Sequence, residues 1–264
     1  MEKKIKTILT IAGSDPGAGA GIQSDLKTFK NHGLYGLTVI TAITAQNTHG
    51  VSFSHPLRYN VVASQLSSVL SDFKPSVAKI GVLGEGGSIK AISSILKRNK
   101  EIRIVYDPVI RSKNDFLFIN ELSLSSIKKY LFKILYLMTP NLFEAQHISG
   151  INITDTSTLE SAMKKIYNMG CRNVLVKGGH FDKRLGIPAG TDILYSGGKF
   201  TFFKGPFIKT KNTHGIGCTF SSAIASNLAL GNNLVKSISE SKKYVIKSLQ
   251  RKIKAGTGIG PVEI

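Results

Sequence analysis

The stretch NTHGIGCTFSSAIASNLALG, residues 212–231, places Gly215, Gly217 and Cys218 directly before an apolar segment of helical composition. Glycines at a helix start leave backbone N–H groups exposed, and these groups attract anions together with the helix dipole. The same field stabilises a cysteine thiolate, so we expect the helix end to lower the Cys218 pKa. The stretch therefore predicts an anion site beside a reactive sulfur. The alternative is a plain glycine turn followed by a small buried cysteine.

A glycine-rich turn, GSDPGAGAG, follows the first expected strand and runs from Gly13 to Gly21. It carries no Gly-Lys-Ser/Thr ending and lacks the GxGxxG spacing, so neither a Walker loop nor a dinucleotide site is indicated. More glycines are present than a tight turn requires. The turn therefore predicts close approach of the backbone to a small ligand.

Side chains that could bind a ring, a phosphate or a metal follow the other expected strands. Gln46 in TAQNTHG could read a flat polar ring through its amide, or serve as a turn residue. Asn141 and Glu144 in TPNLFEA have the spacing of a helix cap, and the same pair could serve a magnesium–phosphate site. Asp107 in YDPV and Lys177 in VKGG also follow strands, and a lysine there could meet a phosphate. Together they favour phosphoryl transfer without a P-loop.

The hydrophobic pattern alternates between strands and helices with short connections. We expect strands at 5–11, 37–45, 77–82, 102–106, 134–138 and 173–176, with a hairpin at 193–194 and 200–203 around YSGGK. We expect helices at 19–32, 61–73, 88–99, 124–132, 144–149, 158–169, 220–230 and 234–253. This order predicts one α/β domain over residues 1–264, with a mostly parallel central sheet and helices on both faces. Ligands of such folds bind at the carboxyl ends of the strands, where the residues above lie.

Composition limits the function classes. The chain has 264 residues, 35 basic against 16 acidic, and a formal net charge of +19. Its lysines are spread out and do not alternate with aromatics, so we expect a solvated basic surface and no specific nucleic-acid site. The first apolar run is too short for a signal peptide, and no segment predicts a membrane span. Two cysteines make no disulfide framework, which favours a cytoplasmic location.

The motifs in their order resemble the ribokinase superfamily, and within it the hydroxymethylpyrimidine/phosphomethylpyrimidine kinases of thiamine biosynthesis. The segments that carry this resemblance are TIAGSDPGAGAGIQSDLKTF, YGLTVITAITAQNTHGV, KIGVL, DPVI, TPNLFEA, VKGGH and THGIGCT. The resemblance implies a ribokinase-like fold and a cytosolic homodimer. It also implies an ATP-dependent, Mg²⁺-requiring kinase that phosphorylates the pyrimidine alcohol and then its monophosphate to the diphosphate.

The resemblance also implies roles for particular residues. The catalytic position and anion hole would be Gly215, Gly217 and Cys218, with the cysteine in the place where related sugar kinases carry an aspartate base. The pyrimidine site would comprise Gly13, Asp25, Thr44, Gln46 and Val82. The residues toward ATP would be Asp107, Asn141, Glu144, Lys177 and Thr213. Of these, Asn141 and Glu144 would reach Mg²⁺ through water.

The chain departs from the family pattern at three places. Ile216 stands where the family usually has threonine, the segment RSKNDFLF is one residue shorter than usual, and DPGAGAG replaces a form richer in serine and glycine. Two alternatives remain open at this point. One is a pyridoxal-type kinase of the same superfamily, whose substrate is also a flat ring with a hydroxymethyl arm. The other is a catalytically weakened anion-binding protein, which the charge would permit.

Overall fold

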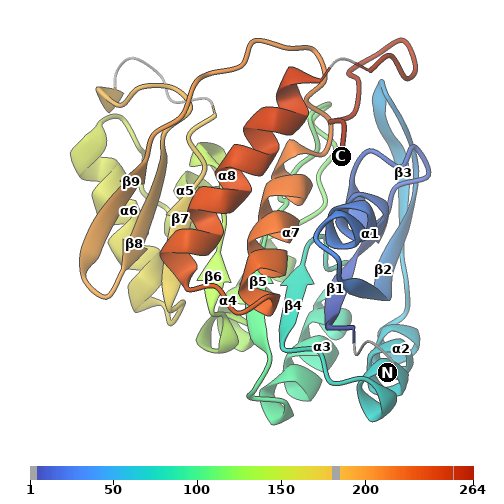
Figure 1. The fold of residues 1–264 in the computed structure, drawn as a ribbon. Coiled ribbons are helices and arrows are strands. Elements are labelled where there is room, and N and C mark those ends of the chain that lie inside the picture. The colour runs from blue at the N-terminus through green and yellow to red at the C-terminus, as the bar shows by residue number, and fades with distance from the viewer. Residues whose placement is uncertain (1–4, 180–184, 252) are drawn as a thin grey trace.

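The computed structural model describes residues 5–179, 185–251 and 253–264, and a nine-stranded sheet runs through this part of the chain (Figure 1). The order of strands across the sheet is β3-β2-β1-β4-β5-β6-β7-β8-β9. The strands are β1 (Thr7–Ser14), β2 (Tyr35–Asn47), β3 (Gly50–Pro56), β4 (Val77–Ile80), β5 (Arg103–Tyr106), β6 (Leu137–Met138), β7 (Asn173–Val176), β8 (Asp192–Ser196) and β9 (Lys199–Phe203). The helices are α1 (Gly21–Asn31), α2 (Tyr59–Asp72), α3 (Gly86–Arg98), α4 (Glu121–Tyr130), α5 (Leu142–Ser149), α6 (Thr156–Asn168), α7 (Ile216–Ala229) and α8 (Leu234–Gln250), with a 3-10 turn η1 (Phe132–Ile134).

The central strands β2, β1, β4, β5, β6 and β7 pair in parallel, as the sequence predicts. The edges are antiparallel. The hairpin β8–β9 turns through Gly197 and Gly198, both with positive φ, which two-residue hairpin turns favour. Strand β3 pairs antiparallel with β2 and was not predicted, because its polar GVSFSHP sequence lacks the apolar pattern of a buried strand.

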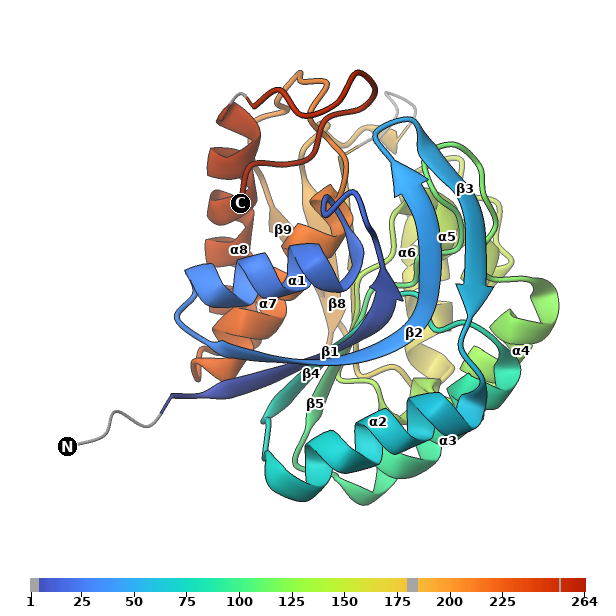
Figure 2. The ribbon, with the colours of Figure 1, turned by 90° about the vertical axis from the view of Figure 1, so that its right-hand side faces the viewer.

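Helices cover both faces of the sheet (Figure 2). Neighbouring residues of β1 point to opposite faces, so Leu9 joins the core under α2 to α6 and Ile8 joins the core under α1, α7 and α8. Helix α8 is amphipathic and places Leu234, Ile238 and Val245 in the second core. The arrangement confirms the predicted α/β fold with helices on both faces.

The ends of the helices show where local sequence signals acted. Asn141 caps α5 and Asp155 caps α6, each through a reciprocal capping box, and Gly150 ends α5 in the left-handed region. Helix α7 begins at Ile216, four residues before the predicted start, because Gly215 provides the positive φ at the N-cap. Cys218 therefore lies inside the first turn of α7 rather than before it.

Two sequence segments fall partly outside the described residues. These are the lysine-rich start, residues 1–4, and His180 of the VKGGH segment. Among the described residues, no helix combines the length and apolarity that crossing a bilayer requires.

Candidate active site at the carboxyl edge of the sheet

The N-terminus of α7 is open. Its N-cap is Gly215, with φ 79°, and no side chain of the described residues accepts a hydrogen bond from the first turn. A Cβ at Gly215 would collide with the carbonyl of Gly19, so the α7 start lies directly against the glycine-rich turn. The first N–H groups of a helix have no intrahelical acceptor, and those of Gly217 and Cys218 fall in this turn. The start of α7 therefore has N–H groups of the kind that bind anions, and an anion site here stays a prediction.

A buried ion pair lies beside this helix end. Lys177 Nζ is 2.5 Å from Oδ1 of Asp107, and a Cβ built at Gly217 would lie 3.4 Å from that Nζ. Thr139 and Ser221 donate to the two carboxylate oxygens of Asp107. Burial alone would lower the Lys177 pKa, but Asp107 and then Glu144 more than offset it, so the pKa is raised. Lys177 is thus a fixed cation at the end of α7.

Asn141 and Glu144 form the N-terminal capping box of α5. Asn141 Oδ1 accepts from the Glu144 N–H at 2.9 Å, and Glu144 Oε2 accepts from the Asn141 N–H at 2.7 Å. The Glu144 pKa is raised overall to about 7, and burial is the largest cause. Asp107 adds to the rise, and Lys177, whose Nζ is 3.9 Å from Oε2, opposes it. The predicted helix cap is therefore confirmed, and it lies beside the Lys177–Asp107 pair; the predicted role toward phosphate and magnesium stays a prediction.

These two side chains are compatible with magnesium held through water. The Asn141 amide oxygen and Glu144 Oε2 already serve the cap, and direct ligation by either of these two atoms would compete with it. Within the described ranges, no three His, Cys, Asp or Glu side chains are grouped to hold a metal ion. Mg²⁺ commonly keeps several waters, so a water-mediated contact is compatible with this arrangement.

The end of β2 meets the loop before α7. Gln46 Nε2 is 3.2 Å from Nε2 of His214, and the same ring nitrogen is 2.9 Å from Oδ2 of Asp15. Thr44 Oγ1 donates to the Ser14 carbonyl at 2.8 Å. The predicted ring-reading amide therefore lies at the junction of the β1, β2 and α7 loops.

Asp15 organises the glycine-rich turn. Its carboxylate accepts from the N–H groups of Gly17, Gly19 and Ala20, in addition to His214. Burial alone would raise the Asp15 pKa, but His214 and these amides hold it below its ordinary value. Neither Asp15 nor His214 was predicted as a site residue.

Gly13 and Val82, two residues of the predicted pyrimidine site, lie side by side. A Cβ at Gly13 would be 3.7 Å from the Val82 Cβ.

Thr213 is contacted by Lys113, whose Nζ donates to the Thr213 carbonyl at 2.5 Å and to its hydroxyl. The structure thus places Thr213 beside the RSKNDFLF segment, which crosses from the end of β5.

Asp25 is completely buried, with 0% of its surface exposed. Its carboxylate accepts hydrogen bonds from Lys79, Thr10 and Ser222. The expectation that Asp25 holds the pyrimidine directly therefore needs correction for this arrangement. Lys79, which completes the pair, follows the apolar strand pattern of KIGVL and was not singled out from the sequence.

The expected lowering of the Cys218 pKa is wrong for this structure. The residue keeps part of its surface exposed, but burial of the thiol raises its pKa to about 11. Lys79 is the leading influence in the opposite direction, and Asp25 and Asp107 add to the rise. Desolvation of the thiolate thus raises the Cys218 pKa by more than the helix N-terminus lowers it.

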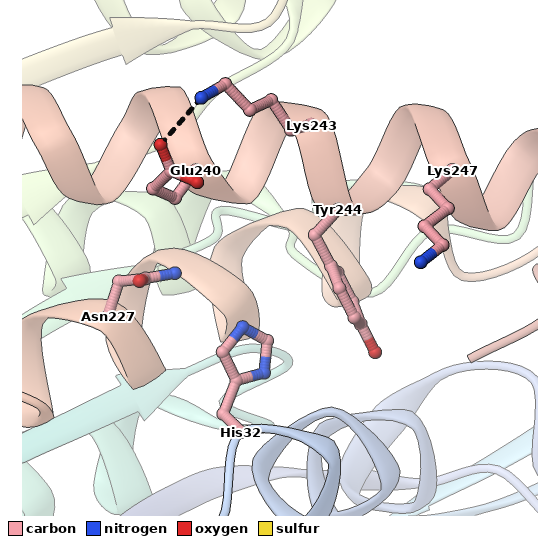
Figure 3. Close-up of a pocket in the computed structure, with 6 residues that line it drawn as sticks. All are labelled: His32, Asn227, Glu240, Lys243, Tyr244 and Lys247. Carbon is pink, nitrogen blue, oxygen red and sulfur yellow. Dashed lines mark hydrogen bonds and ion pairs between the residues drawn. The ribbon is translucent and has the colours of Figure 1, made fainter.

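A separate cavity of about 340 Å³ lies at the far end of α7 (Figure 3). His32 of α1, Asn227 of α7 and Tyr244 of α8 line it, together with Glu240, Lys243 and Lys247. Asn227 is more than two turns of α7 beyond Cys218. This cavity is therefore distinct from the candidate active site.

Comparison with known proteins places the chain in one family. The model of the phosphomethylpyrimidine kinase family matches residues 15–263. The chain is 43% identical over 258 residues to the thiamine biosynthesis bifunctional protein ThiED of Geobacter sulfurreducens, covering 97% of this chain and 51% of that protein. It is 35% identical over 257 residues to the hydroxymethylpyrimidine/phosphomethylpyrimidine kinase of Haemophilus influenzae, covering 97% and 96%.

Two solved structures have the same fold. A phosphomethylpyrimidine kinase from Clostridium difficile 630 matches with a TM-score of 0.81 and 38% identity, covering 94% of this chain and all of that one. A pyridoxal kinase from Staphylococcus aureus in complex with ADP matches with a TM-score of 0.88 and 32% identity, covering 98% and 93%. The fold is thus ribokinase-like, and the chain belongs to the phosphomethylpyrimidine kinase family.

Proposed function

We propose that this protein is an ATP-dependent kinase that phosphorylates 4-amino-5-hydroxymethyl-2-methylpyrimidine, and then its monophosphate to the diphosphate, in thiamine biosynthesis. The observation that carries the proposal is the placement of Cys218 in the uncapped first turn of α7, beside the Lys177–Asp107 pair. The names of the full-length relatives support the substrate class.

In this proposal Cys218 is the base for the attacking hydroxymethyl group. The Cys218 thiolate takes the hydroxyl proton, the substrate oxygen forms a bond to the γ-phosphorus, and the bond from that phosphorus to the β–γ bridging oxygen breaks. ADP leaves with the electron pair of that broken bond. The N–H groups of Gly217 and Cys218 at the α7 start, where Gly215 frees the backbone, face the oxygens of the phosphoryl group in transfer.

The ring and the nucleotide occupy opposite sides of Cys218 in this proposal. Gly13, Thr44, Gln46 and Val82 border the pyrimidine, and the Gln46 amide pairs with a ring nitrogen and its neighbouring amino group. Toward the ATP side lie Asp107, Asn141, Glu144, Lys177 and Thr213.

Magnesium would be held at Asn141 and Glu144 through water, since the Asn141 amide oxygen and Glu144 Oε2 serve the α5 cap. A bound Mg²⁺ neutralises charge on the transferring phosphates. The chain's own contribution is the buried Glu144 carboxyl, set 3.9 Å from the Lys177 ammonium.

We also propose a cytosolic homodimer. Ile43 of β2 and Phe53 of β3 are exposed to 53% and 59%, and their register places them on one face of the β2–β3 ribbon. Such neighbouring apolar side chains are typical of a surface covered by a partner.

Both cysteines are free thiols, which supports a reducing compartment.

Two other functions compete with this proposal. A pyridoxal-type kinase is favoured by the fold match to the S. aureus pyridoxal kinase. A weakened anion-binding protein is favoured by the net charge of +19.

One experiment separates the three functions. ATP consumption is measured separately with hydroxymethylpyrimidine, its monophosphate and pyridoxal, with Mg²⁺ present and with Mg²⁺ removed by a chelator. The proposal expects turnover of both pyrimidines at a higher kcat/KM than pyridoxal, and loss of turnover with the chelator. Preference for pyridoxal would favour the first alternative, and no turnover would favour the second.

A further inference from the structure

A buried ion pair joins α1 to the centre of the sheet. Lys79 of β4 lies with its Nζ 2.9 Å from both carboxylate oxygens of Asp25, and both side chains are 0% exposed. Burial alone would lower the Lys79 pKa, but Asp25 and, more weakly, Cys218 and Asp107 more than offset this, so the pKa is raised. The charged form of Lys79 is therefore favoured although both members of the pair are removed from water.

The Asp25 carboxylate is fully used, while the ammonium is not. Thr10 donates to one Asp25 oxygen at 2.5 Å and Ser222 to the other at 2.6 Å. Among the described residues, Lys79 Nζ donates only to these two oxygens, which leaves one of its three N–H groups without an acceptor. A Cβ at Gly81 would lie 3.2 Å from Nζ, so the ammonium rests against the backbone just before Val82.

The pair is tied to Cys218 through α7. Ser222 lies one helical turn after Cys218 on the same face of α7, and that face packs toward Asp25. The Lys79 charge is the largest influence that lowers the Cys218 pKa, against the rise caused by burial.

Other charged or polar groups face the Cys218 thiol from the surrounding elements. Asp25 and Asp107 raise its pKa, and the Gly21 N–H at the start of α1 lowers it. Lys177 also interacts with this sulfur, because a negative charge on Cys218 Sγ raises the Lys177 pKa. Of the two cations, only Lys79 is completely removed from solvent.

We propose that Lys79 is a positioning residue for phosphoryl transfer: its ammonium, fixed by Asp25, stabilises the anion that forms on Cys218 Sγ when the thiol loses its proton. The S–H bond breaks with its proton passing to water, and it forms again when the thiolate takes the proton of the substrate hydroxyl. This inference rests on the proposed function of Cys218 as base. It assigns Asp25 to holding Lys79 rather than to contacting the pyrimidine.

The test is the pH dependence of Cys218 alkylation by iodoacetamide in the full chain without nucleotide, because only the thiolate reacts. Peptide mapping separates Cys218 from the buried Cys171, whose pKa burial raises to about 12. For Lys79→Met we expect the rate curve to move to higher pH, with alkylation at a fixed pH about tenfold slower or more, since one pKa unit is tenfold in thiolate.

Three further variants control the experiment. Lys79→Arg keeps the charge, so its rate should stay within about threefold of the wild type. Lys242→Met breaks a different buried pair, the one with Asp192, and should leave the curve in place. Where Lys79→Met fails to fold because Asp25 stays unpaired, the Asp25→Asn/Lys79→Met pair removes both charges. Its curve should also move to higher pH, because Lys79 outweighs Asp25 at the thiol.

An unchanged curve in the folded Lys79→Met variant, or faster alkylation at lower pH, would overturn the inference and leave Lys79 with a packing role. Loosened packing would expose the thiol and return its pKa toward the ordinary value, which is the opposite direction. The alkylation readout is independent of kinase activity. A wild type inactive on both pyrimidines would therefore overturn the proposed function alone, and an unmoved curve in an active enzyme would overturn this inference alone.

Discussion

Lys177 Nζ lies 2.5 Å from Asp107 Oδ1, joining the residues that follow β7 and β5 across the end of β6. The side chains are 15% and 2% exposed, so the pair is shielded from solvent. Because the pair is adjacent to Gly217, its two opposite charges lie beside the first turn of α7.

The Lys177→Met variant should lose stability, because Asp107 would remain buried without its cation. Breaking a buried pair typically costs about 3–5 kcal/mol of unfolding free energy. The Asp107→Asn/Lys177→Met double variant should be less destabilised than the sum of the two single changes. Urea unfolding of all four proteins gives this cycle, and strictly additive losses would show that the two side chains do not interact.

Gln46→Leu should impair recognition of the pyrimidine while the fold is kept. A site that hydrogen-bonds a substrate group loses about 10²-fold or more in kcat/KM when the pairing is removed. Asn47→Ala, at the next position and exposed, is the matched control. Steady-state kinetics with hydroxymethylpyrimidine measure the effect, and an unchanged kcat/KM in Gln46→Leu would remove this residue from the ring site.

Asp15→Asn should destabilise the glycine-rich turn at neutral pH. Its carboxylate accepts several amide hydrogen bonds and one from His214, and a hydrogen bond to a charged group contributes about 1.5–3 kcal/mol of net stability. The Asp15 pKa is lowered in the folded state, so its stabilisation is complete above the ordinary value and is lost as pH falls through the folded-state pKa.

Urea unfolding at neutral and acidic pH measures this dependence. The gap in unfolding free energy between wild type and Asp15→Asn should narrow in acid. The exposed Asp72→Asn variant should show no such gap at either pH. A gap that stays constant or widens in acid would contradict the assigned charge state of Asp15.

The basic surface should bind polyanions weakly and without sequence preference. Fluorescence anisotropy with two unrelated duplex DNA sequences should give equal affinities that fall steeply as salt rises, because binding of this kind depends on counterion release. Tight binding to one sequence at physiological salt would require a specific nucleic-acid site.

Apart from β3, the strands of the sheet could be predicted from the sequence because hydrophobic alternation and strand-terminal motifs coincide. Asp107, Asn141 and Lys177 could be placed at one edge, since the carboxyl ends of parallel strands meet there. The Asn141–Glu144 cap was also predictable, because capping depends on residues three apart.

Contacts between distant segments could not be predicted from local patterns. His214 meets Asp15 across 199 positions, and Ser222 meets Asp25 across 197. Lys79 was not singled out from the sequence, because nothing in the KIGVL strand pattern shows that the fold buries this lysine completely. The prediction of a lowered Cys218 pKa was wrong for the same reason. The helix N-terminus can be recognised in the sequence, whereas the desolvation of the Cys218 thiol depends on packing by α1 and β4.

The most direct test of Cys218 as the catalytic base is the kcat of Cys218→Ala with hydroxymethylpyrimidine and saturating ATP. Loss of a general base typically lowers the rate by about 10²–10⁴-fold, and a small side chain replaces a small one, so the circular dichroism spectrum should be unchanged. Cys218→Asp should recover part of the rate, because a carboxylate can also accept the hydroxyl proton. An alanine variant with near-full kcat would contradict the account and leave Cys218 a packing residue at the start of α7.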